Sequence, residues 1–348
     1  MRETIHQDRA AAPIDPRGAA GYPLAMRVLV TGGAGYIGSV VIEELLAAQH
    51  DVVAYDDLST GHRDAVVAPA RLVEGDLLDA ERVGDTLRAH RIDAVVHMAG
   101  AALVGESVAK PAAYYRTNLS GGLVLLEAMR AAGVGRLVFS STAAVYGNAE
   151  TPPIDEDAPM LPTNPYGETK LAFERALRWY GEAYGMHSIR LRYFNAAGAT
   201  ERSGERHAVE THLVPLALQV AAGTRDALPL FGDDYPTPDG TCIRDYVHVS
   251  DLARAHVRAL EALAAGRPDA SYNLGRGGTG ASVRQVIDVA RRITGRDVRV
   301  RVVPRRAGDP PRLVASAERI RRELGWTPLV PSLEEIVESA WRWMVDRA

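Results

Sequence analysis

The chain has 348 residues, 47% of them hydrophobic and 24% charged, a composition typical of a globular protein with one large core or two lobes around a cleft. The net charge of −4 argues against nucleic acid as the main partner, and no apolar run approaches the roughly 20 residues that span a bilayer. The single cysteine, Cys242, excludes an intrachain disulfide, argues against a structural zinc site and is typical of a reducing compartment, so we expect a cytoplasmic protein.

Residues 1–25 carry charged, polar and small side chains without any helical or strand period, and prolines and glycines are scattered among them. A signal peptide would need an apolar central segment, which this stretch lacks. We therefore expect a disordered leader, or a start codon assigned too early, with the fold beginning at Met26.

From Arg27 onwards, short apolar stretches alternate with amphipathic ones. Strands are predicted over Arg27–Thr31, Val52–Tyr55, Arg71–Glu74, Ala94–His97, Leu137–Ser140 and Ser188–Arg192, and helices over Ile37–Ala48, Ala80–His90, Tyr114–Ala132 and Tyr166–Tyr184. Strand–helix alternation with right-handed crossovers predicts an α/β fold with a doubly wound parallel sheet and helices on both faces.

The first predicted strand runs into a glycine-rich turn in which Gly32, Gly35 and Gly38 have the spacing G-x-x-G-x-x-G. Glycine allows the backbone to turn tightly and to approach phosphate groups closely. The helix that begins near Tyr36 offers free N–H groups at its N-terminus. The motif indicates a dinucleotide pyrophosphate site, although simple turns can match the same pattern.

Acidic and small residues follow the next strands. Asp56 comes directly after the second strand, where a carboxylate can accept hydrogen bonds from an adenosine ribose, although a capping aspartate would also fit. Asp56 and Asp57 would repel the additional phosphate of NADP. Asp76 follows the third strand and could reach the adenine, but turn chemistry explains it equally well. Ala99 and Gly100 are small where a cofactor would lie close to the backbone. We predict NAD as the cofactor.

Tyr166 and Lys170 lie four residues apart, on one face of a predicted helix. A free tyrosine has a pKa near 10, and the lysine is placed to lower that pKa and make the phenol a base. Thr142, just after the fifth strand, supplies a hydroxyl that could hold a substrate oxygen or relay a proton. An exposed amphipathic pair is the alternative, but the position after Pro165 and downstream of Ser140 favours redox chemistry on an alcohol.

The pattern changes after Asn195, where segments rich in glycine, proline and charge interrupt the alternation. We expect a NAD-binding Rossmann domain over residues 26–195, with residues 247–275 packing back on it. Residues 196–348 are expected to form a smaller, partly interwoven C-terminal domain for the substrate.

Several motifs occur together between Met26 and the C-terminus. They are Thr31–Gly38, Val104–Val108, Ser140–Gly147, Tyr166–Lys170, Arg192–Asn195, Phe231–Tyr235, Asp239–Thr241, Arg244–Val249, Tyr272–Gly275 and Arg305–Asp309. This set resembles the extended short-chain dehydrogenase/reductase family and, within it, looks like the UDP-sugar 4-epimerases. The resemblance implies reversible C4 epimerisation of UDP-galactose and UDP-glucose through a 4-keto intermediate, with tightly bound NAD.

The resemblance also implies roles for individual residues: Tyr166 is the base, Lys170 its partner, and Thr142 stands at the family's Ser/Thr position. The expected cofactor-binding residues are Gly32, Gly35, Tyr36, Ile37, Gly38, Asp56, Asp57, Leu58, Ser59, Thr60, Gly61, Asp76, Leu77, Met98, Ala99, Gly100, Ala101, Ala102, Thr117, Asn118, Ser140, Tyr166, Lys170 and Phe194. The expected substrate-binding residues are Thr142, Asn195, His212, Leu213, Arg244, Tyr246, Arg306, Asp309 and Leu313. Guanidinium groups are suitable partners for a diphosphate, and no metal is expected.

Three positions depart from the family pattern. Thr117 and His212 each replace an asparagine that is common among relatives, at the cofactor and at the nucleotide respectively. Leu313 stands where the size of the residue controls whether an N-acetylated sugar fits. Leucine is of intermediate size, so activity on UDP-GlcNAc and UDP-GalNAc remains open.

Three other functions are compatible with parts of the sequence. A nucleotide-sugar 4,6-dehydratase needs an acid/base pair for elimination, which relatives place directly after the threonine, whereas Thr142 is followed by Ala143 and Ala144. A UDP-pentose 4-epimerase would differ only near C5 of the sugar. A dinucleotide-sensing protein without catalysis would not need the Tyr166–Lys170 pair.

The family resemblance also implies a homodimer through helices 114–132 and 166–184. The apolar faces of these helices fit either that interface or packing within the chain.

Overall fold

The computed structural model describes residues 25–149, 152–306 and 309–347. The leader predicted over residues 1–25 lies outside these residues, except for Ala25. Among the described residues, no helix has both the length and the apolar composition needed to cross a membrane.

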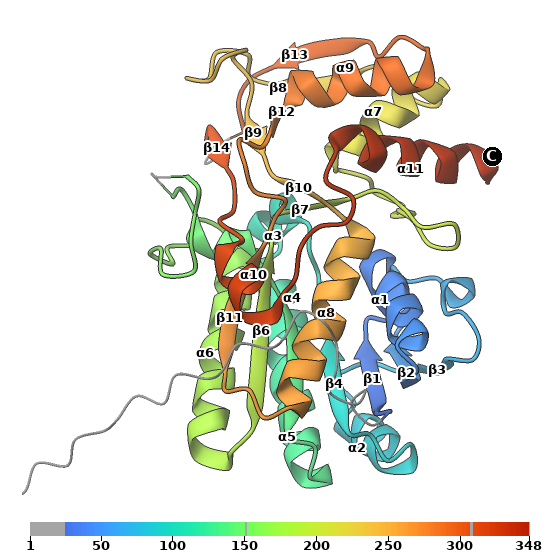
Figure 1. Ribbon diagram of the computed structural model, residues 1–348, viewed down its shortest axis with the longest axis vertical. Helices are drawn as coiled ribbons and strands as arrows, with labels where there is room; N and C mark the ends of the chain where they lie inside the picture. Colours follow the sequence, from blue (N-terminus) through green and yellow to red (C-terminus); the bar gives the residue numbers. More distant parts are fainter. Residues whose placement is uncertain (1–24, 150–151, 307–308, 348) are drawn as a thin grey trace, which may run out of the picture.

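A seven-stranded sheet forms the centre of the described structure (Figure 1). In spatial order its strands are β11 (Ala270–Leu274), β6 (His187–Tyr193), β5 (Arg136–Thr142), β4 (Ala94–His97), β1 (Arg27–Thr31), β2 (Asp51–Asp56) and β3 (Arg71–Glu74). Every neighbouring pair is parallel. The strand order changes direction between β1 and β4, which defines a doubly wound sheet with a topological switch point. The predicted α/β fold and its six strands are confirmed.

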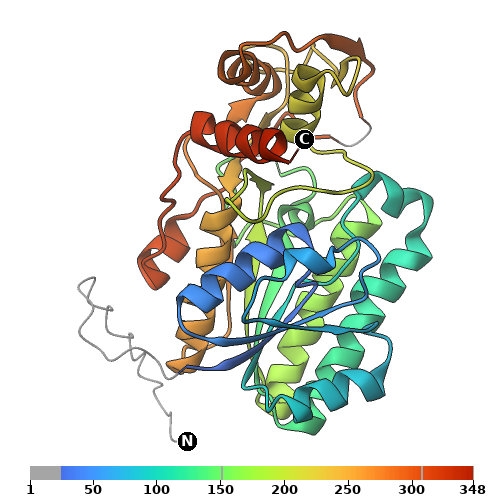
Figure 2. The same cartoon turned by 90° about the vertical axis from the view of Figure 1, so that its right-hand side faces the viewer.

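Two layers of helices cover this sheet (Figure 2). The core on one face packs α1 (Tyr36–Ala47), α8 (Val249–Ala264) and α10 (Glu318–Leu324) against the strands. The other face is covered by α2 (Ala80–Ala89), α5 (Gly121–Ala132) and α6 (Pro165–Tyr184). Because both faces are buried, the central strands are almost continuously apolar, as in Val28-Leu29-Val30 of β1.

The helix predicted over Tyr114–Ala132 is divided in the structure. It consists of α4 (Pro111–Tyr114), a π-helical segment over Tyr115–Ser120, and α5; α3 (Val104–Ala109) precedes it. The π-helical segment carries the buried Asn118, whose side chain binds the backbone of Ala101. A wider turn of this kind is common where a helix serves a functional site.

A second lobe packs around α7 (Leu213–Ala222), α9 (Val283–Thr294) and α11 (Leu333–Asp346). Its short strands are β8 (Leu228–Phe231) with β13 (Val300–Val303), and β12 (Ala281–Ser282) with β9 (Ile243–Arg244) and β14 (Arg312–Leu313). Between the lobes, β7 (Asn195–Ala197) pairs with β10 (Tyr246–His248). The chain crosses between the lobes repeatedly, because α8 and β11 return to the central sheet after β10.

Candidate active site

A cavity of about 1570 Å³ lies where the carboxyl ends of the central strands face the second lobe. In open α/β sheets, ligands bind at this edge, beside the topological switch point. The cavity is lined by every residue predicted for the cofactor or the substrate except Leu58, Gly61 and Asn118. Residues from widely separated parts of the sequence therefore meet in one space.

The turn after β1 has a backbone that only small residues permit. Gly32 has a φ of +70°, and a Cβ atom there would lie 2.7 Å from the backbone nitrogen of Ala99. A Cβ atom on Gly38 would collide with the carbonyl oxygen of Gly32. Gly35 is the N-cap of α1 and makes no side-chain cap. The first N–H groups of α1 are therefore available to a phosphate, and the turn fits a dinucleotide pyrophosphate.

Asp56 ends β2 and is almost fully buried at the cavity. One carboxylate oxygen accepts a hydrogen bond from the N–H of Ala34, and the other accepts one from the N–H of Leu58, both at 2.9 Å. Burial raises the pKa of Asp56, and the two backbone N–H groups oppose this rise. Gly61 leaves room beside the carboxylate, since a Cβ atom there would lie 2.8 Å from Oδ1. Leu58 and Gly61 do not line the cavity: the first holds the Asp56 carboxylate by a hydrogen bond, and the second leaves space for it.

The other two predicted acids also line the cavity and cap local turns. Asp57 accepts a hydrogen bond from the N–H of Ser59, and Asp76 accepts one from the N–H of Leu78, each at 2.9 Å. The local turn chemistry weighed for Asp76 is thus present, and its position at the cavity also allows contact with a nucleoside.

The loop after β4 is held from behind by Asn118. The side-chain oxygen of Asn118 accepts a hydrogen bond from the N–H of Ala101 at 2.8 Å, and its nitrogen donates to the Ala101 carbonyl at 3.0 Å. The same nitrogen donates to Thr169 Oγ1 at 3.1 Å. Asn118 therefore fixes this loop from outside the cavity and connects it to α6.

Tyr166 and Lys170 occupy the first turns of α6. The helix begins here because Asn164 caps it, its side-chain oxygen accepting a hydrogen bond from the N–H of Gly167 at 2.9 Å, and because Pro165 occupies the first turn. Lys170 is buried, and its Nζ donates a hydrogen bond to the carbonyl of Ser140 at 3.0 Å.

The pKa shifts of Tyr166 and Lys170 differ in part from the prediction that the lysine lowers the pKa of the phenol. Burial raises the pKa of Tyr166, and the opposing contribution comes from a hydrogen bond with Thr142. Lys170 was expected to lower this pKa, but in the structure its amine is directed to the Ser140 carbonyl. Burial lowers the pKa of Lys170 to about 8, and Glu174 opposes that change. The phenol thus needs further positive charge before it can act as a base at neutral pH.

The second lobe brings cationic side chains to the same cavity. The Nη1 of Arg244 donates to the carbonyl of Pro310 at 2.9 Å, and its Nη2 pairs with Asp309. The guanidinium of Arg306 lies 3.9 Å from the centre of the Phe231 ring. Groups held in this way are suited to a diphosphate.

His212 reaches the cavity beside Glu210, with 2.8 Å between Nδ1 and Oε1. Burial alone would lower the pKa of His212, but Glu210 and Glu205 outweigh burial and raise it. The two carboxylates thus favour the protonated form of His212 at the cavity.

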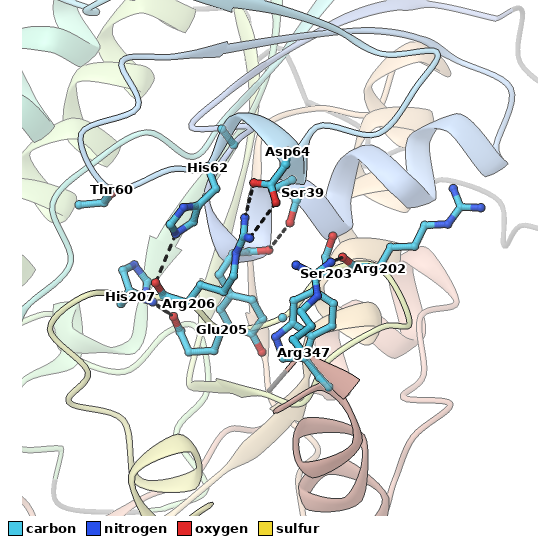
Figure 3. A pocket seen from close by; sticks show the side chains of 16 residues that line it. Ser39, Thr60, His62, Asp64, Arg202, Ser203, Glu205, Arg206, His207 and Arg347 are labelled. Atoms are coloured by element: carbon cyan, nitrogen blue, oxygen red, sulfur yellow. Dashed lines mark hydrogen bonds and ion pairs between the residues drawn. The ribbon is translucent and has the colours of Figure 1, made fainter. Parts of the chain in front are cut away.

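The sequence did not identify residues 198–207 as part of the site. This segment crosses from the second lobe to the loop after β2, where Arg206 donates to both oxygens of Asp64 at 2.9 and 2.7 Å (Figure 3). The phenol of Tyr36 donates to the carbonyl of Gly198, and Glu205 and Arg206 line the cavity. The segment has no motif, and Asp64 is 142 residues away from Arg206, so no local pattern could reveal the contact.

Comparisons with known proteins agree with this arrangement. Residues 28–275 match the model of the NAD dependent epimerase/dehydratase family. The chain is 53% identical to the UDP-glucose 4-epimerase of Corynebacterium glutamicum, over 91% of this chain and 95% of that protein.

Solved structures are similar over the same length. The UDP-glucose 4-epimerase of Brucella ovis in complex with NAD has a TM-score of 0.89 and 46% identity, over 91% of this chain and 98% of that one. The enzyme of Bifidobacterium longum in complex with NAD+ and UDP has a TM-score of 0.87 and 37% identity, over 92% and 98%. Sequence, fold and the glycine turn lead to one conclusion: the chain belongs to the NAD dependent epimerase/dehydratase family, and its cofactor is NAD.

Proposed function

We propose that this chain is an isomerase that interconverts UDP-galactose and UDP-glucose by inverting C4 of the sugar. The observation that carries the proposal is the single cavity that joins the glycine turn and Asp56, the Tyr166–Lys170 pair, and the arginines of the second lobe. The relatives described above are all UDP-glucose 4-epimerases, and one of them is solved with NAD+ and UDP.

Each group has a distinct part in this reaction. Tyr166 removes the proton of the sugar 4-OH, Thr142 holds that oxygen, and the positive charge of Lys170 stabilises the phenolate. NAD, when bound, supplies the acceptor and donor for the C4 hydride. Loss of the proton from O4 and of the hydride from C4 gives a 4-keto sugar. Return of the hydride to the opposite face of C4, and of the proton to O4, inverts the centre.

The second lobe determines how the sugar is held. Arg244 and Arg306 bind the diphosphate, so the keto sugar remains free to turn about its bond to the phosphate. Contacts to the nucleotide then contribute most of the binding free energy, and few contacts favour one orientation of the sugar.

Conversion of UDP-galactose by the purified protein without added NAD tests the proposal, with the products resolved by chromatography. We expect UDP-glucose to form. If no UDP-glucose forms even after NAD is supplied, the proposal is wrong. A 4-keto-6-deoxy product would instead identify a dehydratase, an outcome that we do not expect because Ala143 and Ala144 cannot act as an acid or a base.

Leu313 is proposed to limit the size of the accepted sugar. It lies in β14 in register with Arg244 and lines the cavity. Leu313→Tyr should lower turnover of UDP-GalNAc by roughly tenfold or more, because added bulk in a packed site costs about 1–3 kcal/mol. Turnover of UDP-galactose should change by less than about threefold. Equal losses on both substrates would show that Leu313 does not discriminate between them.

We also propose that the enzyme is a cytoplasmic homodimer that associates through helices 114–132 and 166–184. The support is that these helices expose large aromatic side chains: Tyr115, Trp179 and Tyr184 are 42%, 57% and 55% exposed. Exposed apolar surface can mark an interface, and the single cysteine is compatible with a reducing compartment. Light scattering should give twice the mass of the chain, and Trp179→Glu should give the monomer mass. A monomeric wild type would exclude the dimer.

A further inference from the structure

Glu174 is buried on α6, one helical turn after Lys170, and has no part in the reaction described above. It forms an ion pair with Arg192, in which Nε donates to Oε1 at 3.0 Å and Nη2 donates to Oε2 at 2.6 Å. Both side chains are about 5% exposed. A buried ion pair is costly to desolvate and is weak evidence for stability alone, so its role needs an explanation.

The same carboxylate holds the end of β5. The hydroxyl of Ser141 donates to Glu174 Oε1 at 2.5 Å. Ser141 lies between Ser140, whose carbonyl accepts the hydrogen bond from Lys170, and Thr142, which contacts Tyr166. Successive side chains of a strand point to opposite faces. Glu174 therefore holds the Ser141 side chain on the α6 face of β5, at a point where Ser141 and Thr142 both line the cavity.

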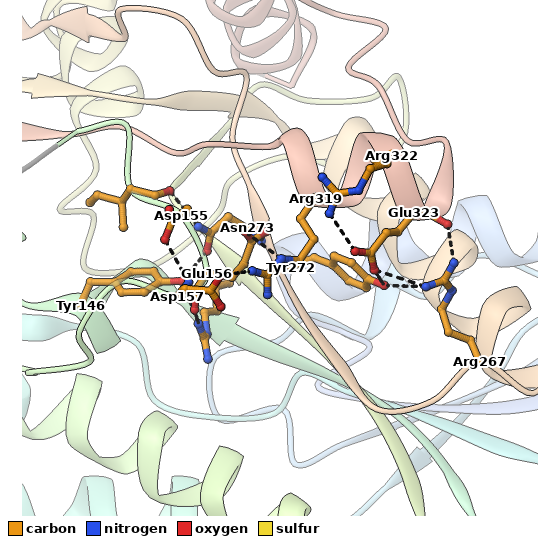
Figure 4. Close-up of polar contacts among 12 residues, drawn as sticks. Tyr146, Asp155, Glu156, Asp157, Arg267, Tyr272, Asn273, Arg319, Arg322 and Glu323 are labelled. Carbon is orange, nitrogen blue, oxygen red and sulfur yellow. Dashed lines mark hydrogen bonds and ion pairs between the residues drawn. The ribbon is translucent and has the colours of Figure 1, made fainter. Parts of the chain in front are cut away.

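Arg192 extends this connection to β6 and β11. Its Nη1 donates to the hydroxyl of Tyr146 at 2.8 Å, and that hydroxyl donates to Asn273 Oδ1 at 2.7 Å. The backbone N–H of Asn273 donates to Glu156 Oε1 at 2.8 Å; Figure 4 shows Tyr146, Asn273 and Glu156 together. A buried network whose members are bonded to one another rigidifies the elements that it joins.

The charge of Glu174 also acts on Lys170. Burial lowers the pKa of Lys170 to about 8, and Glu174 is the group that opposes this change. The other charged or titratable groups around this pair are Arg190 and Arg192 on β6, His97 on β4, Tyr146, Glu156 and Tyr166. Burial lowers the pKa of His97 to about 3, so His97 is neutral. Glu174 is thus the negative group that favours the charged form of Lys170.

We propose that Glu174 is a positioning residue for the reaction: its carboxylate fixes the Ser141–Thr142 end of β5 against α6, and its negative charge stabilises the Lys170 ammonium. This inference rests on the proposed function, because its tests measure the rate of UDP-galactose epimerisation. Wild-type activity is measured first, so failure of the proposed function is recognised before any variant is compared.

The charge is tested with Glu174→Gln, by following kcat and KM against pH in the purified holoenzyme. Without the carboxylate, Lys170 loses its proton at lower pH. The decline of kcat at alkaline pH (the alkaline limb of its pH profile) should therefore begin about one pH unit lower. At pH values above the alkaline declines of both proteins, kcat of Glu174→Gln should be roughly tenfold below that of the wild type. KM for UDP-galactose and the NAD content should be unchanged. A loss that is equal at all pH values, or an unchanged profile, would overturn this part.

The positioning is tested with Ser141→Ala, which keeps both buried charges and removes one hydrogen bond. We expect kcat to fall by about tenfold at every pH without movement of the alkaline limb. The control is Ser282→Ala, in the second lobe. It removes the hydrogen bond from another buried serine to the carboxylate of Asp239, together with the N-cap of α9, so it is the harsher of the two changes. The control should retain wild-type kcat.

Glu174→Asp keeps the charge on a shorter side chain, so it should retain the wild-type alkaline limb while kcat falls. If Glu174→Gln does not fold, Ser141→Ala and Glu174→Asp decide the matter. Wild-type kcat in Ser141→Ala would overturn the positioning role. An alkaline limb displaced in Glu174→Asp would overturn the electrostatic one.

Discussion

At the scale of single residues, the proposed role of Tyr166 as the base depends on its surroundings. Burial raises its pKa, and the hydrogen bond with Thr142 opposes that rise. Tyr166→Phe should lower kcat by roughly 10²–10⁴-fold, which is the contribution of a positioned general base. KM should change little, and the variant should still contain NAD, as measured in the supernatant after denaturation. A variant with near-normal turnover would show that the proton leaves by another route.

Lys170 sets a limit at alkaline pH. Its pKa is lowered to about 8, and an amine carries its charge below its pKa and loses it above. The contribution of Lys170 is therefore largely present at neutral pH and is lost as the pH rises through about 8, so kcat should decline there. Lys170→Arg should extend the plateau to higher pH, because arginine does not lose its proton in this range. If the wild-type rate continues to rise above pH 9, this interpretation is wrong.

At the scale of elements, residues 198–207 connect the second lobe to the loop after β2, beside the cavity wall formed by the glycine turn and Asp56. Arg206 lowers the pKa of Asp64 to about 2 through their hydrogen bonds, so the pair remains charged throughout the working range. An exposed pair of this kind contributes at most about 1 kcal/mol, which corresponds to roughly fivefold in a rate. Asp64→Asn should therefore speed NAD release by up to about fivefold, and added salt should accelerate release in the wild type.

Release can be followed as loss of bound NAD during dilution of the holoenzyme into a scavenging dehydrogenase. Arg202→Gln is the matched control, since Arg202 is an exposed arginine on the same segment. If Asp64→Asn and Arg202→Gln release NAD at the same rate, the Asp64–Arg206 contact does not retain the cofactor.

The divided helix over residues 111–132 shows how tertiary contacts change an element. The amphipathic pattern predicts one continuous helix, and the sequence contains no proline or glycine between Tyr115 and Ser120 that would interrupt it. The π-helical segment coincides with Asn118, whose side chain binds Ala101 and Thr169. These partners come from a loop and from α6, so the interruption depends on contacts outside the helix.

At the scale of the whole molecule, the cavity lies between two lobes, and a UDP-sugar bound in it would contact both. A ligand that binds only the folded state stabilises it by about 2.7 kcal/mol at 100 times its Kd. UDP at that ratio should raise the Tm of the holoenzyme by a few degrees. Arg244→Ala should remove most of this shift at the same UDP concentration, because it removes a diphosphate partner. An equal shift in both proteins would place UDP elsewhere.

The sequence by itself determined the parallel sheet, the glycine turn, the acid after β2 and the Tyr166–Lys170 pair. Each is a local pattern, because a strand, the turn after it and one face of a helix involve residues close together in the chain. The tertiary structure alone decided that Arg206 meets Asp64 and that Arg192 and Ser141 meet at Glu174. Those contacts depend on which distant segments pack together. Charge and hydrogen-bonding capacity make many partners possible, and only the packing of the whole chain selects among them.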